Sequence, residues 1–560
     1  MDFTSLLVAA QLAVVVACLP QPGEASRFAG STVSAVFPPP GATGTSLDAF
    51  FPDASQVGHA GPTPTGDEPW LVETAPAGPL KQDINPLVIS PPSSTETYPG
   101  NGDSTAFNRA RSWGNLSPWW SLEGNDSFGL PDASEIVPAG CELTQVHLLH
   151  RHGARYPTGG SAPSQFAGLV NAAATSTGFN ATGPLEFLNT WTYKLGEEIL
   201  TPFGRQQLFN LGVGFRTKYG HLLKDFTELP VFRTTSDARM VDSALNFAAG
   251  FFGVQQYESS YHQLIVIEDD GFYNSLDPWD ACPNANNDDS NLGILAFSNW
   301  TAVYLNETVP RLQQYIEGID LDLEAVLGMQ QLCPYETIAL GYSAFCELFT
   351  DDEWRGYEYA IDLEVWYSFG PGNPTSAAQG LGWIQELVAR LTHTPLNNFD
   401  MTTNNQTLDS SNITFPVNQP IYVDATHDVV VSVILTALNF TSMAAAGPPP
   451  VDHIQENQTY FSSHVVPFAT NLVGQVMSCP SRTSSPSNGS DSFIRFLLND
   501  AVVPLTGVAH CAPDKDGLCA LDDFVKGMEE RIAEIDFEYD CFANYTAPWP
   551  DPIIDGRMKH

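Results

Sequence analysis

The chain has 560 residues, of which 64 are acidic and 23 are Lys or Arg, so its formal net charge is −41 at pH 7. This length exceeds a single ordinary core and favours two domains or one large domain with an insertion, and a hydrophobic content of 43% excludes a chain that is disordered throughout. The acidic balance argues against nucleic acid as a partner, because a phosphate backbone demands a basic face.

The N-terminal segment carries a targeting pattern. An apolar run extends from Leu6 to Leu19, and small residues follow it near position 25. This is typical of a secretory signal peptide, although Asp2 stands where a positive residue is usual. The run is too short to span a bilayer comfortably, and no second run of spanning length follows, so no membrane anchor is expected. We predict a signal peptide over residues 1–25 and a secreted, extracellular protein.

The next segment, residues 26–105, is rich in Pro, Gly, Ser and Thr and has little hydrophobic periodicity. Such a composition predicts a disordered or extended leader. A second interpretation stays open, because the short runs 70–72 and 87–89 are apolar enough to dock on a surface. Packed structure is expected to begin near Trp113.

Strands and helices then alternate along the chain, which predicts a parallel or mixed α/β sheet. Helices are expected at 201–219, 236–252 and 429–438. Strands are expected at 146–149, 229–232, 263–267, 420–424 and 492–497.

Between these two α/β portions, residues 283–400 become mostly helical, with helices expected at 301–316 and 377–391. We interpret this stretch as an inserted helical cap. The predicted organisation is therefore an α/β core over 106–282 and 401–548, a cap over 283–400 and a short tail over 549–560.

The residues R-H-G-A-R-Y-P at 151–157 follow the first predicted strand. Open α/β sheets bind ligands at the carboxyl ends of their strands. Arg151 and Arg155 offer fork-shaped donors for a phosphate, and Gly153 lets the backbone approach closely. His152 would then lie beside an electron-poor phosphorus.

This motif resembles the signature of the histidine acid phosphatases, the branch of the phosphoglycerate-mutase-like superfamily that includes fungal phytases. Other runs resemble the same family over about 113–548. They are V-D-A-T-H-D at 423–428, R-T-T-S-D-A-R at 233–239, L-T-P-F-G at 200–204 and G-P-G-N-P at 370–374. The resemblance implies a phosphoglycerate-mutase-like α/β core with the helical cap inserted in it.

Carried over residue by residue, the resemblance implies that His152 is the nucleophile and Asp428 the proton donor. It implies that the phosphoryl oxygens are held by Arg151, Arg155, Arg239 and His427. Arginines can supply the charge neutralisation that Mg²⁺ supplies in other phosphoryl-transfer enzymes, so no metal and no cofactor is expected.

Some neighbouring residues receive a structural interpretation instead. Arg233 is expected to brace its turn, and His147 and His150 to be structural residues of the first strand. Asp428 is followed by Val429 where phytases often have Asn. This departure leaves the proton donor intact but puts phytase-like contacts to the leaving group in doubt.

The cysteines and glycosylation sequences agree with secretion. Apart from Cys18 there are eight cysteines and no Cys-x-x-Cys pair, which favours disulfides over zinc. Spacing alone leaves the pairing open, and the resemblance implies Cys141–Cys479, Cys282–Cys541, Cys333–Cys346 and Cys511–Cys519. Acceptor sequences for N-glycans occur at Asn115, Asn125, Asn180, Asn299, Asn306, Asn405, Asn412, Asn439, Asn457, Asn488 and Asn544.

The leading hypothesis is a secreted acid phosphatase that hydrolyses small phosphate monoesters through a phosphohistidine. A phytase with the same mechanism is the close alternative, since the sequence shows no basic rim for the polyanion phytate. A phosphomutase and a non-catalytic extracellular phosphate-binding protein are more remote. The sequence leaves the oligomeric state open.

Overall fold

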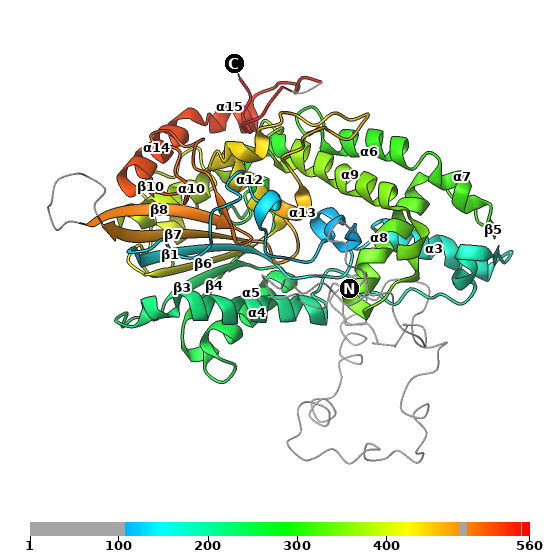
Figure 1. Ribbon diagram of the computed structural model, residues 1–560, viewed down its shortest axis with the longest axis horizontal. Helices are drawn as coiled ribbons and strands as arrows, with labels where there is room; N and C mark the ends of the chain where they lie inside the picture. The colour runs from blue at the N-terminus through cyan, green and yellow to red at the C-terminus, as the bar shows by residue number, and fades with distance from the viewer. Residues whose placement is uncertain (1–106, 481–489, 550–551, 560) are drawn as a thin grey trace, which may run out of the picture. The chain divides into compact units, whose positions relative to one another are not determined.

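The structure is a computed structural model that describes residues 107–480, 490–549 and 552–559 (Figure 1). The predicted signal peptide and leader lie outside the described residues. Trp113, where packed structure was expected to begin, is fully buried. None of the helices in the described ranges is long and apolar enough to cross a membrane.

A mixed sheet forms the centre of the described part of the chain. Its strands follow the order β10-β8-β7-β1-β6-β3-β4, and β9 pairs with β8. β1, β6, β3 and β4 are parallel, whereas β7, β8, β9 and β10 add in antiparallel pairs. The strands are β1 (Glu142–Arg151), β3 (Val231–Thr235), β4 (His262–Val266), β6 (Ile421–Thr426), β7 (Asn471–Pro480), β8 (Ser490–Leu498), β9 (Ala501–Val503) and β10 (Cys519–Ala520).

Helices cover both faces of this sheet, and β1 shows why. Val146 and Leu148 of β1 pack in one cluster with Phe247, whereas Leu149 joins the core on the opposite face. Figure 1 shows helices on both faces of the sheet. They are α4 (Pro202–Tyr219) and α5 (Ala238–Phe252) on the first face, and α10 (Ser376–Thr392), α12 (Asp428–Ala437) and α14 (Leu521–Glu534) on the second.

A group of helices lies beside one end of the sheet (Figure 1), where α3 packs against α8 and α6 against α9. The capping box of Thr350 and Glu353 begins α9. The helices are α3 (Ala162–Thr175), α6 (Gly293–Tyr304), α7 (Thr308–Gln313), α8 (Leu323–Leu340) and α9 (Asp351–Phe369). This agrees with the predicted fold class, an α/β core with a helical region.

Shorter elements complete the described chain. β2 (Asn180–Ala181) and β5 (Ile316–Glu317) pair with each other, and α11 (Gln406–Asp409), α13 (Ser462–Val465) and α15 (Phe537–Phe542) are short α-helices. The 3-10 helices are Arg109–Arg111, Gly114–Leu116 (η4), Gly124–Asp126, Gly183–Asn189, Gly220–Leu223, Tyr257–Ser259, Trp279–Ala281, Pro283–Asn286, Ala344–Leu348 and Thr441–Ala444.

Two predicted elements differ from the structure. The single helix expected at 301–316 is divided between α6 and α7, because Pro310 lacks an N–H group and its ring would clash with the carbonyl of Asn306 in a continuous helix. The strand expected at 229–232 instead covers Val231–Thr235, and Pro230 immediately precedes it.

Two packing contacts bear on the predicted domain ranges. α10 lies within the range expected as the cap, yet it packs against α12 and α14 on the sheet. Residues 552–559 were expected as part of a tail, but they pack against the N-terminal end of α10. There the Ala377 N–H donates to the Gly556 carbonyl at 3.0 Å.

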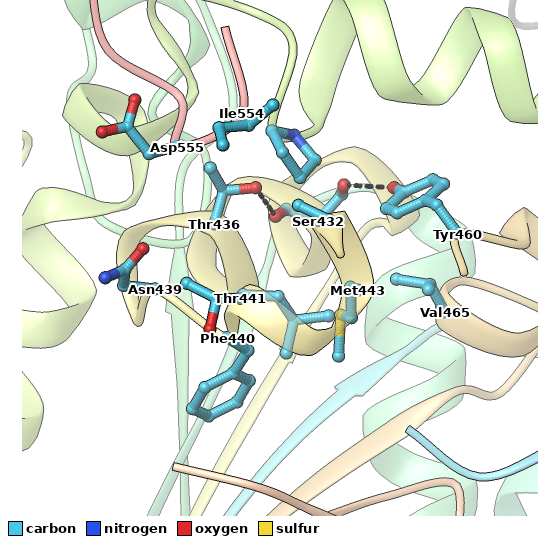
Figure 2. A pocket seen from close by; sticks show the side chains of 13 residues that line it. Ser432, Thr436, Asn439, Phe440, Thr441, Met443, Tyr460, Val465, Ile554 and Asp555 are labelled. Atoms are coloured by element: carbon cyan, nitrogen blue, oxygen red, sulfur yellow. Dashed lines mark hydrogen bonds between the residues drawn. The ribbon is translucent and has the colours of Figure 1, made fainter. Parts of the chain in front are cut away.

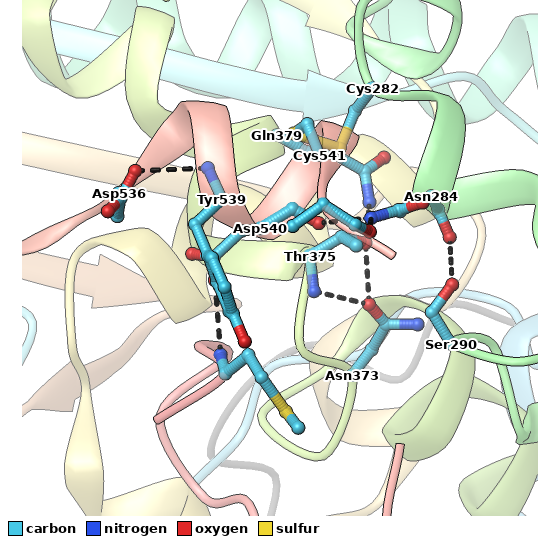
Figure 3. The surroundings of a disulfide bond; sticks show 12 residues. Cys282, Asn284, Ser290, Asn373, Thr375, Gln379, Asp536, Tyr539, Asp540 and Cys541 are labelled. Carbon is cyan, nitrogen blue, oxygen red and sulfur yellow. Dashed lines mark hydrogen bonds between the residues drawn. A yellow bond between two sulfur atoms is a disulfide. The ribbon is translucent and has the colours of Figure 1, made fainter. Parts of the chain in front are cut away.

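The described residues contain four disulfides, with the pairing that the resemblance implied, and two of them join segments that are distant in sequence. Figure 3 shows one of them, Cys282–Cys541, which links the segment after β4 to α15. Beside it, Asn284 donates to the carbonyls of Asp540 and Ala543 at 3.0 and 2.9 Å. The other pairs are Cys141–Cys479, Cys333–Cys346 and Cys511–Cys519.

A buried ionic network lies behind the ends of β3 and β6. Asp424 of β6 accepts from Arg233 Nε at 2.7 Å and from Arg390 Nη1 at 2.7 Å. Arg233 also donates to both oxygens of Glu386, at 3.0 and 2.5 Å. Burial alone would raise the pKa of Asp424, but the two arginines outweigh it and hold the pKa far below its usual value. Arg233, expected to brace a turn, thus joins two strands to α10.

We expect Asp424→Asn to lower the free energy of unfolding by about 3–5 kcal/mol, because it leaves two buried guanidinium groups short of a counter-charge. Denaturant unfolding at pH 5 measures the change. Asp452→Asn is the control, since Asp452 pairs with His453 at the surface with 79% of its side chain exposed, and it should change stability by less than about 0.5 kcal/mol. Equally small losses in both variants would contradict the prediction.

Candidate active site

Three parallel strands bring the predicted site residues together. Arg151 ends β1 and stands in register with Thr426, which ends β6. His152 therefore follows β1 next to the place where His427 and Asp428 follow β6, and the rings of the two histidines lie 5.7 Å apart. Arg239 comes from the first turn of α5, which follows β3.

Two glycines allow the first turn of α4 to approach the loop after β1. A Cβ on Gly153 would lie 2.2 Å from the Gly204 carbonyl oxygen, and one on Gly204 would lie 2.0 Å from the Ala154 carbonyl oxygen. Thr201 caps α4 by accepting from the Gly204 N–H at 3.1 Å and donates its own hydroxyl to Ala154 O at 3.1 Å. The run L-T-P-F-G thus holds the loop that carries the 151–157 motif.

His152 is placed as a neutral imidazole. Its side chain is buried, and its Nδ1 lies 2.8 Å from the Gly153 carbonyl oxygen. Because a carbonyl only accepts, Nδ1 carries the proton and Nε2 keeps its lone pair. Burial, together with the charges of Arg151, Arg239 and Arg155, lowers the pKa of His152 well below 6.5. A nucleophilic nitrogen therefore remains available in acid.

Arg151 is locked in place from three sides. Its Nη1 donates to the carbonyl oxygens of Asn115 at 2.5 Å and Val466 at 2.7 Å, and its Nη2 lies 2.7 Å from Asp428 Oδ2. The guanidinium also stacks over the Phe468 ring, 4.5 Å from the centroid. Burial lowers the pKa of Arg151 to about 10, so the group stays cationic in acid.

Arg155 and Arg239 complete the cationic cluster. Arg155 Nη1 donates to the Tyr156 carbonyl at 2.9 Å. In the described residues, the Nε atoms of Arg151, Arg155 and Arg239 are buried and lack a hydrogen-bond partner. Buried donors are rarely left unpaired. Three such donors, on arginines whose charges act on His152, suit an anion with several oxygens.

Carboxylates already neighbour most of these cations. Arg239 contacts Glu198 at 3.1 Å and Asp237 at 2.7 Å. His427 Nε2 lies 2.9 Å from Glu268 Oε1, and because a carboxylate only accepts, this nitrogen carries a proton. Burial acts to raise the pKa of Glu268, but the hydrogen bond from His427 outweighs it, so the pKa is lowered. A phosphate that binds here has to compete with these carboxylates.

Asp428 begins α12, directly after His427 as its N-cap residue. Its Oδ2 faces Arg151 and accepts from Asn115 Nδ2 at 2.9 Å, while its Oδ1 accepts from the Val429 N–H at 3.1 Å. Burial acts to raise the pKa of Asp428, but Arg151 and the Asn115 amide outweigh it and hold the pKa below its usual value.

Two other features of the described residues have some of the properties of a ligand site. Asp237, Glu268 and His427 place possible metal-ligand atoms within 4.8 Å of one another, and the hydrogen bond between His427 and Glu268 accounts for part of this grouping. The cavity in Figure 2, lined by Ser432, Tyr460 and others, has a volume of about 20 Å³. A cavity of that size holds about one water molecule, so it cannot take a substrate.

Sequence reasoning missed four residues that contact the predicted site: Asn115, Glu198, Asp237 and Glu268. Asp237 lies within the 233–239 motif, and Glu268 directly follows the predicted strand 263–267, so both could have been found from their place at a strand end. Nothing local marks Asn115 or Glu198. The expected structural residues His147 and His150 are buried in β1, and burial lowers the pKa of His150 to about 4.

The chain is similar in sequence and fold to several known proteins. The family model of the histidine phosphatase superfamily (branch 2) matches residues 142–499. Phytase A of Aspergillus oryzae is 34% identical over 431 residues, covering 74% of this chain and 87% of that protein. Phytase A of Emericella nidulans is 36% identical, with the same coverage. The solved structure of the phytase from D. castellii has a TM-score of 0.62 at 24% identity, covering 79% of this chain and 89% of the other, and supports the fold.

We expect Glu268→Gln to bind inorganic phosphate about threefold to tenfold more tightly than the wild type at pH 5.5, because it removes a carboxylate that competes for His427. The lowered pKa of Glu268 keeps it ionised at that pH, so the difference should shrink as the pH falls through that pKa. Titration calorimetry measures the dissociation constants.

Glu530→Gln is the matched control, since Glu530 pairs with His510 at the same 2.9 Å but at the surface. It should leave phosphate affinity unchanged. Weaker binding by Glu268→Gln would show that Glu268 is needed to orient His427 and does not compete with phosphate.

Proposed function

Because this chain belongs to the histidine phosphatase superfamily (branch 2), we propose that His152 and Asp428 hydrolyse phosphate monoesters, phytate among them, through a phosphohistidine in acid. Family and relatives together make the chain a phosphoric monoester hydrolase. The observation that carries the proposal is the neutral, buried His152, on which the charges of Arg151, Arg239 and Arg155 act. The buried Nε donors of these three arginines have no hydrogen-bond partner among the described residues.

In the first step, Arg151, Arg155, Arg239 and His427 hold the phosphoryl oxygens. The lone pair on His152 Nε2 attacks phosphorus, the bond from phosphorus to the ester oxygen breaks, and Asp428 gives its proton to that oxygen. In the second step a water oxygen attacks phosphorus, the bond to nitrogen breaks, and the water proton returns to Asp428. Phosphate leaves and His152 is neutral again.

The lowered pKa of Asp428 sets a condition on this mechanism, because only the protonated carboxyl can act as an acid. A bound phosphate places negative charge beside Asp428 and shares Arg151 with it, and both effects raise the pKa of Asp428. Acidic solution favours the protonated form further. The proposal therefore includes an optimum on the acid side of neutrality.

The choice of phytate rests on the relatives, two of which are named Phytase A and cover most of this chain at 34–36% identity. The carboxylates at Glu198, Asp237 and Glu268 oppose a polyanion while they are ionised. They also favour a second candidate function, a broad acid phosphatase for simple monoesters. Protonation of these carboxylates in acid weakens their repulsion of phytate. We therefore propose that phytate hydrolysis is confined to low pH.

We also propose that the protein is secreted. The four disulfides fit an oxidising compartment. Mass determination of the mature N terminus in culture medium tests this, with cleavage near residue 25 expected.

The purified enzyme should release phosphate from phytate at pH 3–5, and its kcat/KM for phytate should fall more steeply towards pH 7 than that for glycerol phosphate, since phytate carries more charge. His152→Ala should lower both activities by at least about a thousandfold. Phosphate release assayed over pH 2–8 measures this. Hydrolysis of simple monoesters without phytate would select the broad phosphatase, and turnover by His152→Ala near the wild-type rate would exclude the phosphohistidine.

Asp428→Asn should lower kcat for sugar or glycerol phosphates far more than for nitrophenyl phosphate, because an alkoxide leaves poorly without a proton whereas a nitrophenolate needs little help. We expect kcat to fall about a hundredfold or more for the sugar or glycerol phosphates and about tenfold or less for nitrophenyl phosphate. Rapid-quench kinetics on both substrates separates the first step from the water step. Equal losses on both leaving groups would remove Asp428 from the role of general acid.

A further inference from the structure

Asn115 links two of the site residues with two different groups. Its backbone carbonyl accepts from Arg151 Nη1 at 2.5 Å, and its side-chain Nδ2 donates to Asp428 Oδ2 at 2.9 Å. The same Oδ2 lies 2.7 Å from Arg151 Nη2. Asn115 therefore contacts both members of the Arg151–Asp428 pair.

The turn that carries Asn115, η4 (Gly114–Leu116), is itself fixed. The Gly114 N–H donates to Glu358 Oε2 of α9 at 2.6 Å. Gly114 has φ +57°, and a Cβ there would lie 2.6 Å from Ile361, so only glycine fits. On the other side, Ser117 Oγ accepts from the Trp113 N–H at 3.1 Å, and the Ser117 carbonyl accepts from Phe468 N at 2.9 Å. A turn held from both sides can aim one side chain with little freedom.

We propose that Asn115 is a positioning residue for the proton donor, acting through Asp428, and that its amide nitrogen is unmodified in the active enzyme. This rests on the proposed function, in which Asp428 is the general acid. An amide NH₂ group only donates, so Oδ2 is kept as an acceptor by Asn115 and Arg151 together. The transferable proton is thereby placed on Oδ1, the other oxygen of Asp428.

The same contact contributes to the acidity of Asp428, together with the charges of Arg151, Arg155 and His427. A donor on Oδ2 stabilises the carboxylate, and the Asn115 amide is one of the groups that hold the pKa of Asp428 below its usual value. Removing that donor raises the pKa of Asp428. A carboxylate in its place raises the pKa more, because two like charges would then face each other.

Asn115 also begins an acceptor sequence for N-glycans, Asn115-Leu116-Ser117. The nitrogen that would carry the glycan is the one that donates to Asp428, and Ser117 is completely buried. Modification here is incompatible with the described site. Other acceptor asparagines have exposed side chains: Asn180, Asn299, Asn306, Asn412, Asn457 and Asn544.

The test compares Asn115→Ala and Asn115→Asp with the wild type on glycerol phosphate and nitrophenyl phosphate over pH 2–8. With glycerol phosphate, kcat should fall about tenfold in Asn115→Ala, and with nitrophenyl phosphate less than about threefold. Since the general acid must be protonated, a raised pKa moves the alkaline limb of the kcat profile to higher pH. We expect this limb to shift by about half a pH unit to one pH unit in Asn115→Ala and by more in Asn115→Asp.

Asn108→Ala is the matched control, because Asn108 lies in the same segment and its side chain accepts a hydrogen bond from Ala110 N at 3.1 Å without touching the site. It should keep the wild-type profile. Thermal unfolding shows whether the Asn115 variants are folded at the assay temperature. The inference would be overturned if the alkaline limb of the kcat profile stayed at the wild-type pH in both Asn115 variants. Equal losses of kcat on the two substrates would also overturn it.

Peptide mass spectrometry of active enzyme from a glycosylating host gives an independent readout. Asn115 should be unmodified, and a glycan at Asn115 in fully active enzyme would also overturn the inference. Failure of the proposed function is distinguishable, since the wild type would then not hydrolyse either ester or Asp428→Asn would retain full activity.

Discussion

The buried positive charge around His152 is the constraint on which the rest of this structure depends. Arg151, Arg155 and Arg239 lie in a region from which water is largely excluded, and unpaired cations there are unfavourable by several kcal/mol. The chain balances them with carboxylates, of which Asp428 pairs with Arg151, and Glu198 and Asp237 with Arg239. Burial and the same charges together lower the pKa of His152 well below its usual value. One electrostatic arrangement thus creates the anion site and determines the protonation state of its nucleophile.

The strands and the helix behind the site keep the charged residues close to one another. β1, β6 and β3 are parallel neighbours, so their carboxyl ends lie together, and Asp424 joins β6 to β3 and α10 through Arg233 and Arg390. Two buried carboxyls of α9 hold the loops beside the site. Glu358 accepts from the backbone at Gly114, and Asp362 accepts from Ser462 N at 2.6 Å. The helical region therefore acts on the site through the two loops that contact Arg151.

The sequence was informative where function and local pattern coincide. The 151–157 motif, the His427–Asp428 pair and the run 233–239 each follow a strand recognisable from its apolar residues, and strand ends meet at one edge of a parallel sheet. It was less informative where long-range contacts decide the structure. β7 was not predicted, because Gln475 and Gly474 interrupt its apolar pattern, although Gln475 is buried and donates to Tyr219 at 2.8 Å. Asn115 was missed because its role depends on a turn that only α9 and the segment near Phe468 hold in place.

Carboxyls outside the candidate active site also fit the proposed activity in acid. Burial raises the pKa of Glu336, Glu364 and Asp540 to about 7 and that of Asp277 to about 6. Between their unfolded values near 4 and these folded values, the folded chain binds more protons than the unfolded chain. Their contribution to stability is therefore complete at low pH and is lost as the pH rises towards 7. Asp424 has the opposite shift, so its ion pairs persist until the solution is strongly acidic. Acidic solution, which the proposed chemistry needs in order to protonate Asp428, is therefore also the condition in which these carboxyls stabilise the fold.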